Sequence, residues 1–354
     1  MSRFLAILCS ATLLGAPFDT GTACTAFCLD SGEAVFVAKN YDWSVDAGML
    51  VLNKRGVIKT ADIAGSEDQG TWTSRFGSVT FNQYGRDIPQ GGINEAGVVI
   101  EILWLNDTEY PAPDDRMALG STQWIQYQLD TAGSVGDVLR SDEVVRIESN
   151  VEVHFFVGDR SGESATVEFL GGGRRVHTGD EMVTPVLTNH PYAESVASLD
   201  QFRPSGGSRR APWTNGSLHR FARASARVAE FSRTDREAPI DYAFETLSEV
   251  AQGERTQWSI VYDLTNLEVH FRTRLSPSVK TVSLSALDFD CESVVEVMSI
   301  HTSEADPEWE TYTRQMNRVL IEDSFRGTSF LAQTPDDVLD AVASYPDQAR
   351  CESR

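Results

Sequence analysis

The stretch CTAFCLDSGEAVFVAKNYD, residues 24–42, decides the fold. It contains two apolar-rich segments, residues 25–29 and 34–38, on either side of the turn signal Asp30-Ser31-Gly32. Short apolar runs joined by a few residues that include Gly are typical of a β-hairpin. Because both runs are apolar almost throughout, we expect this hairpin to be buried.

The residues before this stretch have a composition of their own. Residues 1–23 carry one basic side chain, followed by an apolar run over residues 4–14 that is too short to span a membrane. This arrangement is typical of a secretory signal peptide, and the small residues Gly21 and Ala23 fit its cleavage site. We therefore expect residues 1–23 to be removed, which makes Cys24 the amino terminus of the mature chain.

Composition limits the classes of function. The 354 residues are 41% hydrophobic and 23% charged, which is typical of a chain that buries a large core. Acidic residues outnumber basic ones by 52 to 30, and the formal net charge of -22 opposes binding to nucleic acid or anionic lipid. After residue 23, no segment is long and uncharged enough to span a membrane. We expect residues 24–354 to form a single domain of a periplasmic or secreted protein.

The cysteines of the mature chain suggest one disulfide. If residues 25–27 form a strand, the Cα atoms of Cys24 and Cys28 lie ~13 Å apart, beyond the ~7 Å limit for a bridge. An oxidising compartment favours pairing of the remaining cysteines, and Cys291 with Cys351 is the most plausible bridge.

Apolar runs predict further strands, and helical periodicity predicts helices between them. The expected strands cover residues 97–103, 151–157, 165–170, 258–264, 267–273 and 281–287. The expected helices cover residues 122–130, 135–146, 218–231, 240–252, 307–321 and 335–343. This order predicts an α+β fold in which helices pack outside antiparallel sheets.

An amino-terminal cysteine combines a thiol and a free α-amine in one residue. The amine has an ordinary pKa of ~7.7 to 8.0, whereas that of a lysine is ~10.4, so the amine can act as a general base near neutral pH. Cys24 therefore fits the arrangement of an N-terminal nucleophile. The six histidines are scattered, and there is no C-x-x-C or H-E-x-x-H motif, so the sequence gives no support for a metal.

Seven short strings, in order, resemble the choloylglycine hydrolases, which include penicillin V acylases and conjugated bile salt hydrolases. They are CTAFC from Cys24, KNYDW from Lys39, FNQYGR from Phe81, GINEAGV from Gly92, LTNHP from Leu187, HRFAR from His219 and TQWSIVYD from Thr256. The resemblance implies an N-terminal nucleophile hydrolase, built as a four-layer αββα sandwich of two antiparallel sheets flanked by helices. It also implies a homo-oligomer, for example a tetramer, and a reaction without a cofactor.

The resemblance assigns catalytic roles to four residues. Cys24 is the nucleophile and its α-amine the base, while Asp42 orients that amine. Asn189 donates to the oxyanion, and Arg220 is a fixed cation near the thiol. We expect the other arginines of the same helix, Arg223 and Arg227, to lie on a solvated face.

Three residues are candidates for substrate binding. Lys39 stands where bile salt hydrolases have arginine; a lysine keeps the charge but loses the planar pair of donors, so we expect it to act as a cation just behind the residues that touch the substrate. Trp43 and Trp104 offer two aromatic walls for an apolar acyl or phenoxyacetyl group, although either could be ordinary core. This pair resembles the Gram-negative branch of the family. Asn94 is expected to close a turn and to be structural.

The sequence therefore predicts an amidase that hydrolyses linear amides of small molecules. Penicillin V and, as in some relatives, N-acyl homoserine lactones are the favoured substrates, and conjugated bile salts are an alternative. An alternative from another class is a periplasmic lipoprotein or binding module lipidated at Cys24. Lipidation usually requires a branched apolar residue where Gly21 stands, which disfavours that alternative.

Overall fold

The computed structural model describes residues 24–61, 70–202, 216–231, 238–302 and 308–352. The predicted signal peptide, residues 1–23, lies outside these ranges. Among the described helices, none has the length and apolar character that crossing a membrane requires.

The predicted hairpin lies at the centre of a six-stranded sheet with the order β14-β1-β2-β15-β16-β17. All neighbouring strands in this sheet are antiparallel. The strands are β1 (Thr25–Asp30), β2 (Val35–Asp42), β14 (Val186–Leu187), β15 (Thr256–Asp263), β16 (Glu268–Thr273) and β17 (Lys280–Ser283). Both segments of the hairpin are buried, as the unbroken apolar runs predict.

A nine-stranded sheet with the order β13-β12-β11-β8-β7-β6-β3-β18-β19 faces the first one. It is also antiparallel throughout. Its strands are β3 (Met49–Asn53), β6 (Ser78–Asn82), β7 (Gly91–Asn94), β8 (Val99–Trp104), β11 (Val153–Gly158), β12 (Ser164–Leu170), β13 (Gly173–Thr178), β18 (Glu296–Ser299) and β19 (Glu310–Thr311). Two small sheets pair β9 (Met117–Leu119) with β10 (Val145–Ile147), and β5 (Thr71–Thr73) and β20 (Arg350–Cys351) with β4 (Val57–Thr60).

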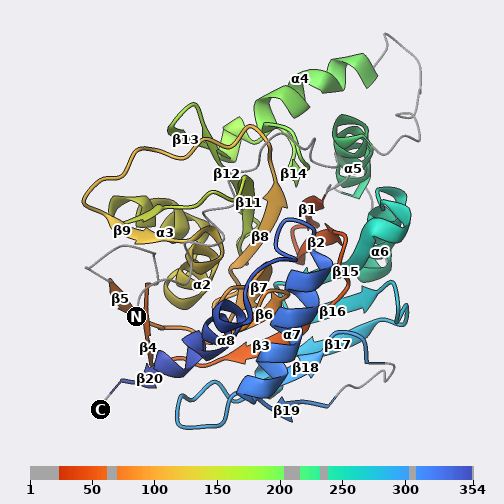
Figure 1. Cartoon of the computed structure of the whole chain (residues 1–354). Helices are drawn as coiled ribbons and strands as arrows, with labels where there is room; N and C mark the ends of the chain where they lie inside the picture. The colour runs from red at the N-terminus through yellow and green to blue at the C-terminus, as the bar shows by residue number, and fades with distance from the viewer. Residues whose placement is uncertain (1–23, 62–69, 203–215, 232–237, 303–307, 353–354) are drawn as a thin grey trace.

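Helices cover the outer faces of the two large sheets. The helices α5 (Ser217–Phe231) and α6 (Pro239–Glu249) contact strands of the six-stranded sheet, and α2 (Ser121–Thr131) contacts β7 and β8 (Figure 1). Buried residues of both sheets, such as Phe27 and Phe156, belong to one apolar core between them. The predicted αββα sandwich is therefore confirmed.

Asn94 at the end of β7 has the structural role that the sequence predicts. Its Nδ2 donates to the carbonyl oxygens of Leu129 and Ala132, at 2.9 and 2.8 Å, near the end of α2. Its Oδ1 accepts from the backbone N–H groups of Ala96 and Val98. One side chain thus closes the turn into β8 and fastens a helix to the sheet.

Three predicted elements differ most in extent. The helix predicted over residues 135–146 ends at Arg140 as α3 (Val135–Arg140), because the chain then turns into the β-branched strand β10. The strand predicted over residues 281–287 ends at Ser283, where a single 3₁₀ turn follows. The helix predicted over residues 307–321 begins at Arg314 as α7 (Arg314–Gly327).

The position of Thr313 explains that later start, because its side chain accepts a hydrogen bond from the backbone N–H of Met316 and caps α7. One further helix, α4 (Tyr192–Phe202), follows β14 and was not predicted from the sequence.

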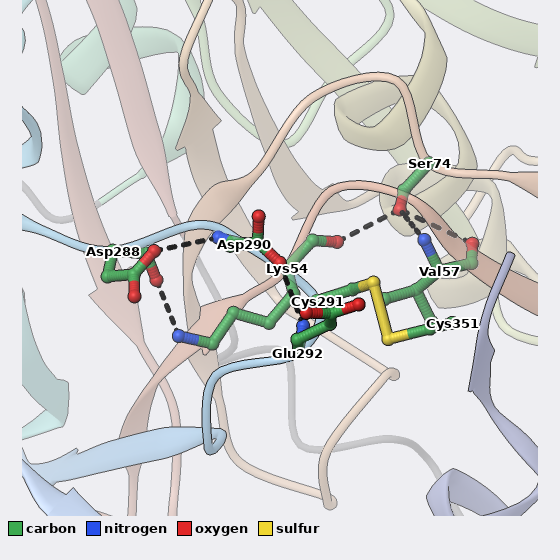
Figure 2. The surroundings of a disulfide bond; sticks show 8 residues. All are labelled: Lys54, Val57, Ser74, Asp288, Asp290, Cys291, Glu292 and Cys351. Atoms are coloured by element: carbon green, nitrogen blue, oxygen red, sulfur yellow. Dashed lines mark hydrogen bonds between the residues drawn. A yellow bond between two sulfur atoms is a disulfide. The ribbon is translucent and has the colours of Figure 1, made fainter. Parts of the chain in front are cut away.

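The C-terminal part of the chain forms a helical pair, α7 and α8 (Asp336–Ser344), followed by β20. The predicted bridge between Cys291 and Cys351 is present, with Cα atoms 5.6 Å apart, and Figure 2 shows it beside Val57 of β4. Cys24 and Cys28 are both free and buried, in agreement with the strand geometry.

Candidate active site

The hairpin brings the predicted nucleophile and its carboxylate together. Cys24 directly precedes β1, and the pairing of Thr25 with Asn40 places Cys24 beside Asp42, the last residue of β2. The backbone N–H of Asp42 lies near the thiol of Cys24 and lowers its pKa, against the larger effect of burial, which raises it. Cys24 is only 5% exposed, yet it lines a pocket. Cys24 and Asp42 are far apart in the sequence, and the turn between β1 and β2 brings them together.

Asp42 is completely buried and has one free acceptor atom. Its Oδ1 accepts from the hydroxyl of Thr256, while its Oδ2 has no hydrogen-bond partner among the described residues. Burial raises the pKa of this carboxyl to about 7, although the cations of Arg220 and Lys39 act in the opposite direction. A buried carboxylate oxygen without a partner is costly, so a donor for it is expected.

The α-amine of Cys24 is the donor that cleavage would create. In the full-length chain this nitrogen belongs to a peptide bond, and hydrolysis after Ala23 would convert it into an amine with up to three N–H donors. An ammonium group beside Asp42 would favour the ionised carboxylate. It would also favour the thiolate of Cys24, whose pKa is raised by burial and lowered by Lys39 and Arg220.

Arg220 connects the nucleophile to the predicted oxyanion residue. It lies in the first turn of α5 and is completely buried. Its Nη1 donates to the carbonyl oxygen of Cys24 and to Oγ1 of Thr25, both at 2.6 Å. Its Nη2 donates to Oδ1 of Asn189 at 2.8 Å. Burial lowers the pKa of the guanidinium to about 10, so it remains a cation at neutral pH.

The amide of Asn189 is held in one orientation. Because a guanidinium only donates, Oδ1 must face Arg220, and Nδ2 then donates to the carbonyl oxygen of Trp104 at 2.7 Å. The backbone N–H of Asn189 donates to Oγ of Ser217 at 2.9 Å. The Trp104 contact uses one of two N–H bonds on Nδ2. The arrangement is suited to aiming the second one at a developing negative charge.

A buried pair that the sequence analysis missed holds the segment that carries Asn189. Nε2 of His154 lies 2.7 Å from the carbonyl oxygen of Thr188, and its Nδ1 lies 3.0 Å from Oε1 of Glu168. Glu168 also accepts from the backbone N–H of Tyr192 at 3.0 Å. The pair therefore holds both ends of the segment 188–192 by hydrogen bonds. A histidine and a glutamate inside two predicted apolar strands were the available signal.

Lys39 lies in a different place from the one expected of a substrate contact. It is completely buried, and its ammonium donates to Oε2 of Glu101 at 2.8 Å and to the carbonyl oxygen of Ile102. Glu101 also accepts from the hydroxyl of Tyr262 on the facing sheet. Lys39 is not among the residues that line the pocket beside Cys24, and its ammonium lies between the two sheets, paired with Glu101. It acts on Cys24 electrostatically, by lowering the pKa of the thiol.

The pocket beside Cys24 encloses about 960 Å³, its open mouth included. Trp43 and Trp104 both line it, with ring centroids 5.9 Å apart, as expected of two aromatic walls. The other apolar or aromatic residues of the lining are Tyr41, Tyr84, Ile88, Ile102, Leu103, Val151, Val153, Phe330 and Leu331. Polar groups come from residues 120–122 and 148–150 and from Gln90. The lining favours an apolar group with a polar end.

The prediction of a solvated arginine face is only partly right. Arg223 is buried, and its Nε donates to the carbonyl oxygen of Glu249 at the end of α6. Arg227 forms ion pairs with Glu230, Glu245 and Glu249. Both arginines therefore join α5 to α6.

One group of described residues has ligand atoms close enough to hold a metal ion. These atoms of Asp263, Glu268 and His270 lie within 4.8 Å of one another, at the turn between β15 and β16. Asp263 already accepts hydrogen bonds from the backbone N–H groups of Thr265 and Asn266. Its carboxylate closes the hairpin turn, at the end of β15 away from Asp42.

Comparison with known proteins adds independent evidence. Residues 24–297 match the linear amide C–N hydrolases of the choloylglycine hydrolase family. The chain is 25% identical to a penicillin V acylase of Pectobacterium atrosepticum, over 81% of this chain and 88% of that protein. The structure resembles penicillin V acylase from Agrobacterium tumefaciens, with a TM-score of 0.72 and 26% identity over 82% of this chain and 98% of the other.

The fold is also that of a conjugated bile acid hydrolase variant from Clostridium perfringens. The TM-score is 0.63 and the identity 16%, over 82% of this chain and 97% of the other.

Proposed function

Because this chain belongs to the choloylglycine hydrolase family of linear amide C–N hydrolases, we propose that Cys24, freed by removal of residues 1–23, is its nucleophile. One observation carries the proposal: the buried Oδ2 of Asp42 lacks a hydrogen-bond partner among the described residues, directly beside Cys24. An α-ammonium on Cys24 supplies the missing donor. The same residue then holds both the nucleophile and the base.

The first half of the reaction forms a thioester. The α-amine takes the thiol proton, and the sulfur of Cys24 attacks the carbonyl carbon of the amide. The carbonyl oxygen becomes an oxyanion, which accepts a hydrogen bond from Nδ2 of Asn189. The C–N bond then breaks, and the leaving amine takes the proton from the α-ammonium. Asp42 stabilises that ammonium while it exists.

The second half restores the enzyme. A water molecule attacks the thioester carbon while the α-amine accepts one of its protons. The oxyanion again faces Asn189, the C–S bond breaks, and the returning proton gives the thiol. The products are the carboxylic acid and the free amine, so protons and electrons balance without a further reactant.

The lining of the pocket supports an apolar acyl group as the part of the substrate that is bound. Trp43 and Trp104 line the same pocket as Cys24, and their neighbouring aromatic rings suit a phenoxyacetyl group. Two penicillin V acylases are among the relatives at 25 and 26% identity. We therefore propose a penicillin V acylase-like activity. The apolar lining at Phe330 and Leu331 also favours long-chain acyl groups, as in N-acyl homoserine lactones.

A release assay with the mature chain tests the proposal. Phenoxyacetyl, long-chain acyl-lactone and glycine-conjugated sterol amides are compared, with Cys24→Ser as the matched control. We expect cleavage of the first or the second substrate and none by the nearly isosteric control. Cleavage of the sterol conjugate alone would favour a bile salt hydrolase. Activity retained by Cys24→Ser would contradict the proposed nucleophile.

Intact mass and detergent partitioning of the protein test the lipoprotein alternative. A lipid adduct on the sulfur of Cys24 would remove the proposed nucleophile and end the hydrolase proposal. A periplasmic or secreted location and assembly into a homo-oligomer are parts of the same proposal, and cell fractionation and light scattering test them.

A further inference from the structure

The pocket contains two residues from outside the region that matches the family. The family match ends at residue 297, yet Phe330 and Leu331 line the pocket together with Cys24. We propose that the C-terminal segment, residues 314–351, is the selectivity wall of the acyl pocket, and that Phe330 sets the preferred acyl length. This inference rests on the proposed function, since it concerns the acyl group that Cys24 receives.

Hydrogen bonds fix the position of this wall relative to the reacting residues. Nε1 of Trp43, the residue after Asp42, donates to the hydroxyl of Tyr84 at 2.6 Å. That hydroxyl lies 2.8 Å from Oγ1 of Thr328, two residues before Phe330. A chain of three side chains therefore links the wall to the strand that carries Asp42.

Two further contacts hold α7 against the same loop. Oγ of Ser324 donates to the carbonyl oxygen of Gln83 at 2.6 Å, and Oδ1 of Asn317 accepts from the backbone N–H of Arg86 at 2.8 Å. Both polar side chains of α7 are buried. Buried hydrogen bonds of this kind specify one position for the helix rather than a sliding contact.

Phe330 and Leu331 differ in how they are held. Leu331 is buried in a small apolar core with Ile88, Ile321 and Phe325, so it supports the fold as well as the pocket. Phe330 is only partly buried and packs at the edge of this core. Phe330 lines the pocket, and its other apolar contacts are limited to the edge of this core. Phe330 is therefore the residue whose size can change selectivity without changing the fold.

The end of the segment is fastened to the rest of the protein. Strand β20 pairs with β4 through Cys351 and Val57, and the bridge to Cys291 joins the same place (Figure 2). The hydroxyl of Tyr345 donates to the carbonyl oxygen of Thr60 at 2.6 Å. The wall is thus anchored on both sides of the pocket-lining residues, by α7 before them and by β20 after them.

The test varies the size of residue 330. We compare kcat/KM for a dodecanoyl amide and a phenoxyacetyl amide in the wild type, Phe330→Ala and Phe330→Trp. The smaller side chain deepens the pocket, so the ratio of long to short acyl substrate should rise by about 10-fold, and Phe330→Trp should lower it below the wild-type value. Phe76→Ala, a partly buried phenylalanine outside the pocket, is the matched control and should leave the ratio unchanged.

Binding measurements distinguish an error in the inference about the selectivity wall from an error in the proposed reaction. Dissociation constants of dodecanoate and phenoxyacetate are measured on Cys24→Ser with and without Phe330→Ala. An unchanged ratio of the two constants would overturn the inference, whether or not the wild type cleaves amides. A shifted ratio together with an inactive wild type would support the wall and contradict only the proposed reaction.

Discussion

Arg220 holds Asn189 by its side-chain oxygen, with Nη2 donating to Oδ1 at 2.8 Å. The same guanidinium binds the carbonyl oxygen of Cys24 at 2.6 Å. One planar group therefore sets the distance between the nucleophile and the group that receives the oxyanion. Such preorganisation lowers the barrier because the donor does not have to reorient during the reaction.

Arg220→Lys should disrupt this arrangement while keeping the charge. A lysine ammonium cannot serve both residues with the geometry of a planar fork, so kcat should fall by ~10²-fold. The same substitution in an Asn189→Ala background should cost much less, because the two residues act as one unit. Arg223→Lys, on the same helix, is the control. Fully additive losses in the double variant would show that Arg220 does not act through Asn189.

The buried pair of His154 and Glu168 should affect turnover through the position of Asn189. Glu168→Gln removes the charge that faces His154 and weakens the grip on residues 188–192. We expect kcat to fall by ~10-fold with KM nearly unchanged, because the donor is needed mainly in the transition state. Glu163→Gln, an exposed charge near the same strand, is the matched control. A loss in KM alone would contradict this positioning role.

Asp42 should make stability depend on whether the amine of Cys24 is free. With that nitrogen acylated, the folded pKa is about 7, against an ordinary value of 3.8. The unfolded chain then loses its proton first, so stability falls as pH rises from 4 to 7, by up to about 4 kcal/mol. A free ammonium pairs with the carboxylate and removes this loss.

Melting temperatures of two forms test that expectation. In a chain with one alanine added before Cys24, we measure the change in Tm that Asp42→Asn causes at pH 8 and at pH 4. The change should be more stabilising at pH 8. In the chain that begins at Cys24, the same substitution should bring no such gain. Equal pH dependence of the change in Tm in both forms would show that the amine of Cys24 does not stabilise the ionised carboxylate of Asp42.

Removing the bridge between Cys291 and Cys351 should destabilise the protein. The bridge closes a loop of 60 residues, for which chain entropy predicts a contribution of about 4 kcal/mol. Urea denaturation of the oxidised wild type and of the double serine variant measures the loss, and reduced wild type is the control that should match the variant. No change in the unfolding midpoint would show that β20 stays in place without the bridge.

Sequence patterns predicted those hairpins whose strands and turns are formed by residues close together in the chain. The hairpin that carries Cys24 and Asp42 and the pair β15 and β16 follow from apolar runs joined by turn residues. The same reasoning overextended the helix that starts at Val135, because the β-branched residues of β10 form a strand by pairing with β9, a separate segment of the chain.

Motifs located the candidate site residues, but not how they act. The contact between Arg220 and Asn189 joins residues 31 positions apart, and Glu101 meets Lys39 across 62 positions. No periodicity in either segment predicts such contacts, because the first is created when α5 packs against the strands β1 and β14, and the second when the two sheets pack. The sequence did not predict Phe330 as a pocket residue for the same reason. Phe330 lines the pocket only because α7 packs against the loop after β6.

The most direct test of the central claim compares the chain that begins at Cys24 with the same chain carrying one extra alanine before it. The addition keeps the thiol but turns the amine into an amide, so kcat/KM for the preferred amide should fall at least ~10³-fold with the fold intact. Full turnover by the extended chain would mean that another group is the base, and would contradict the account.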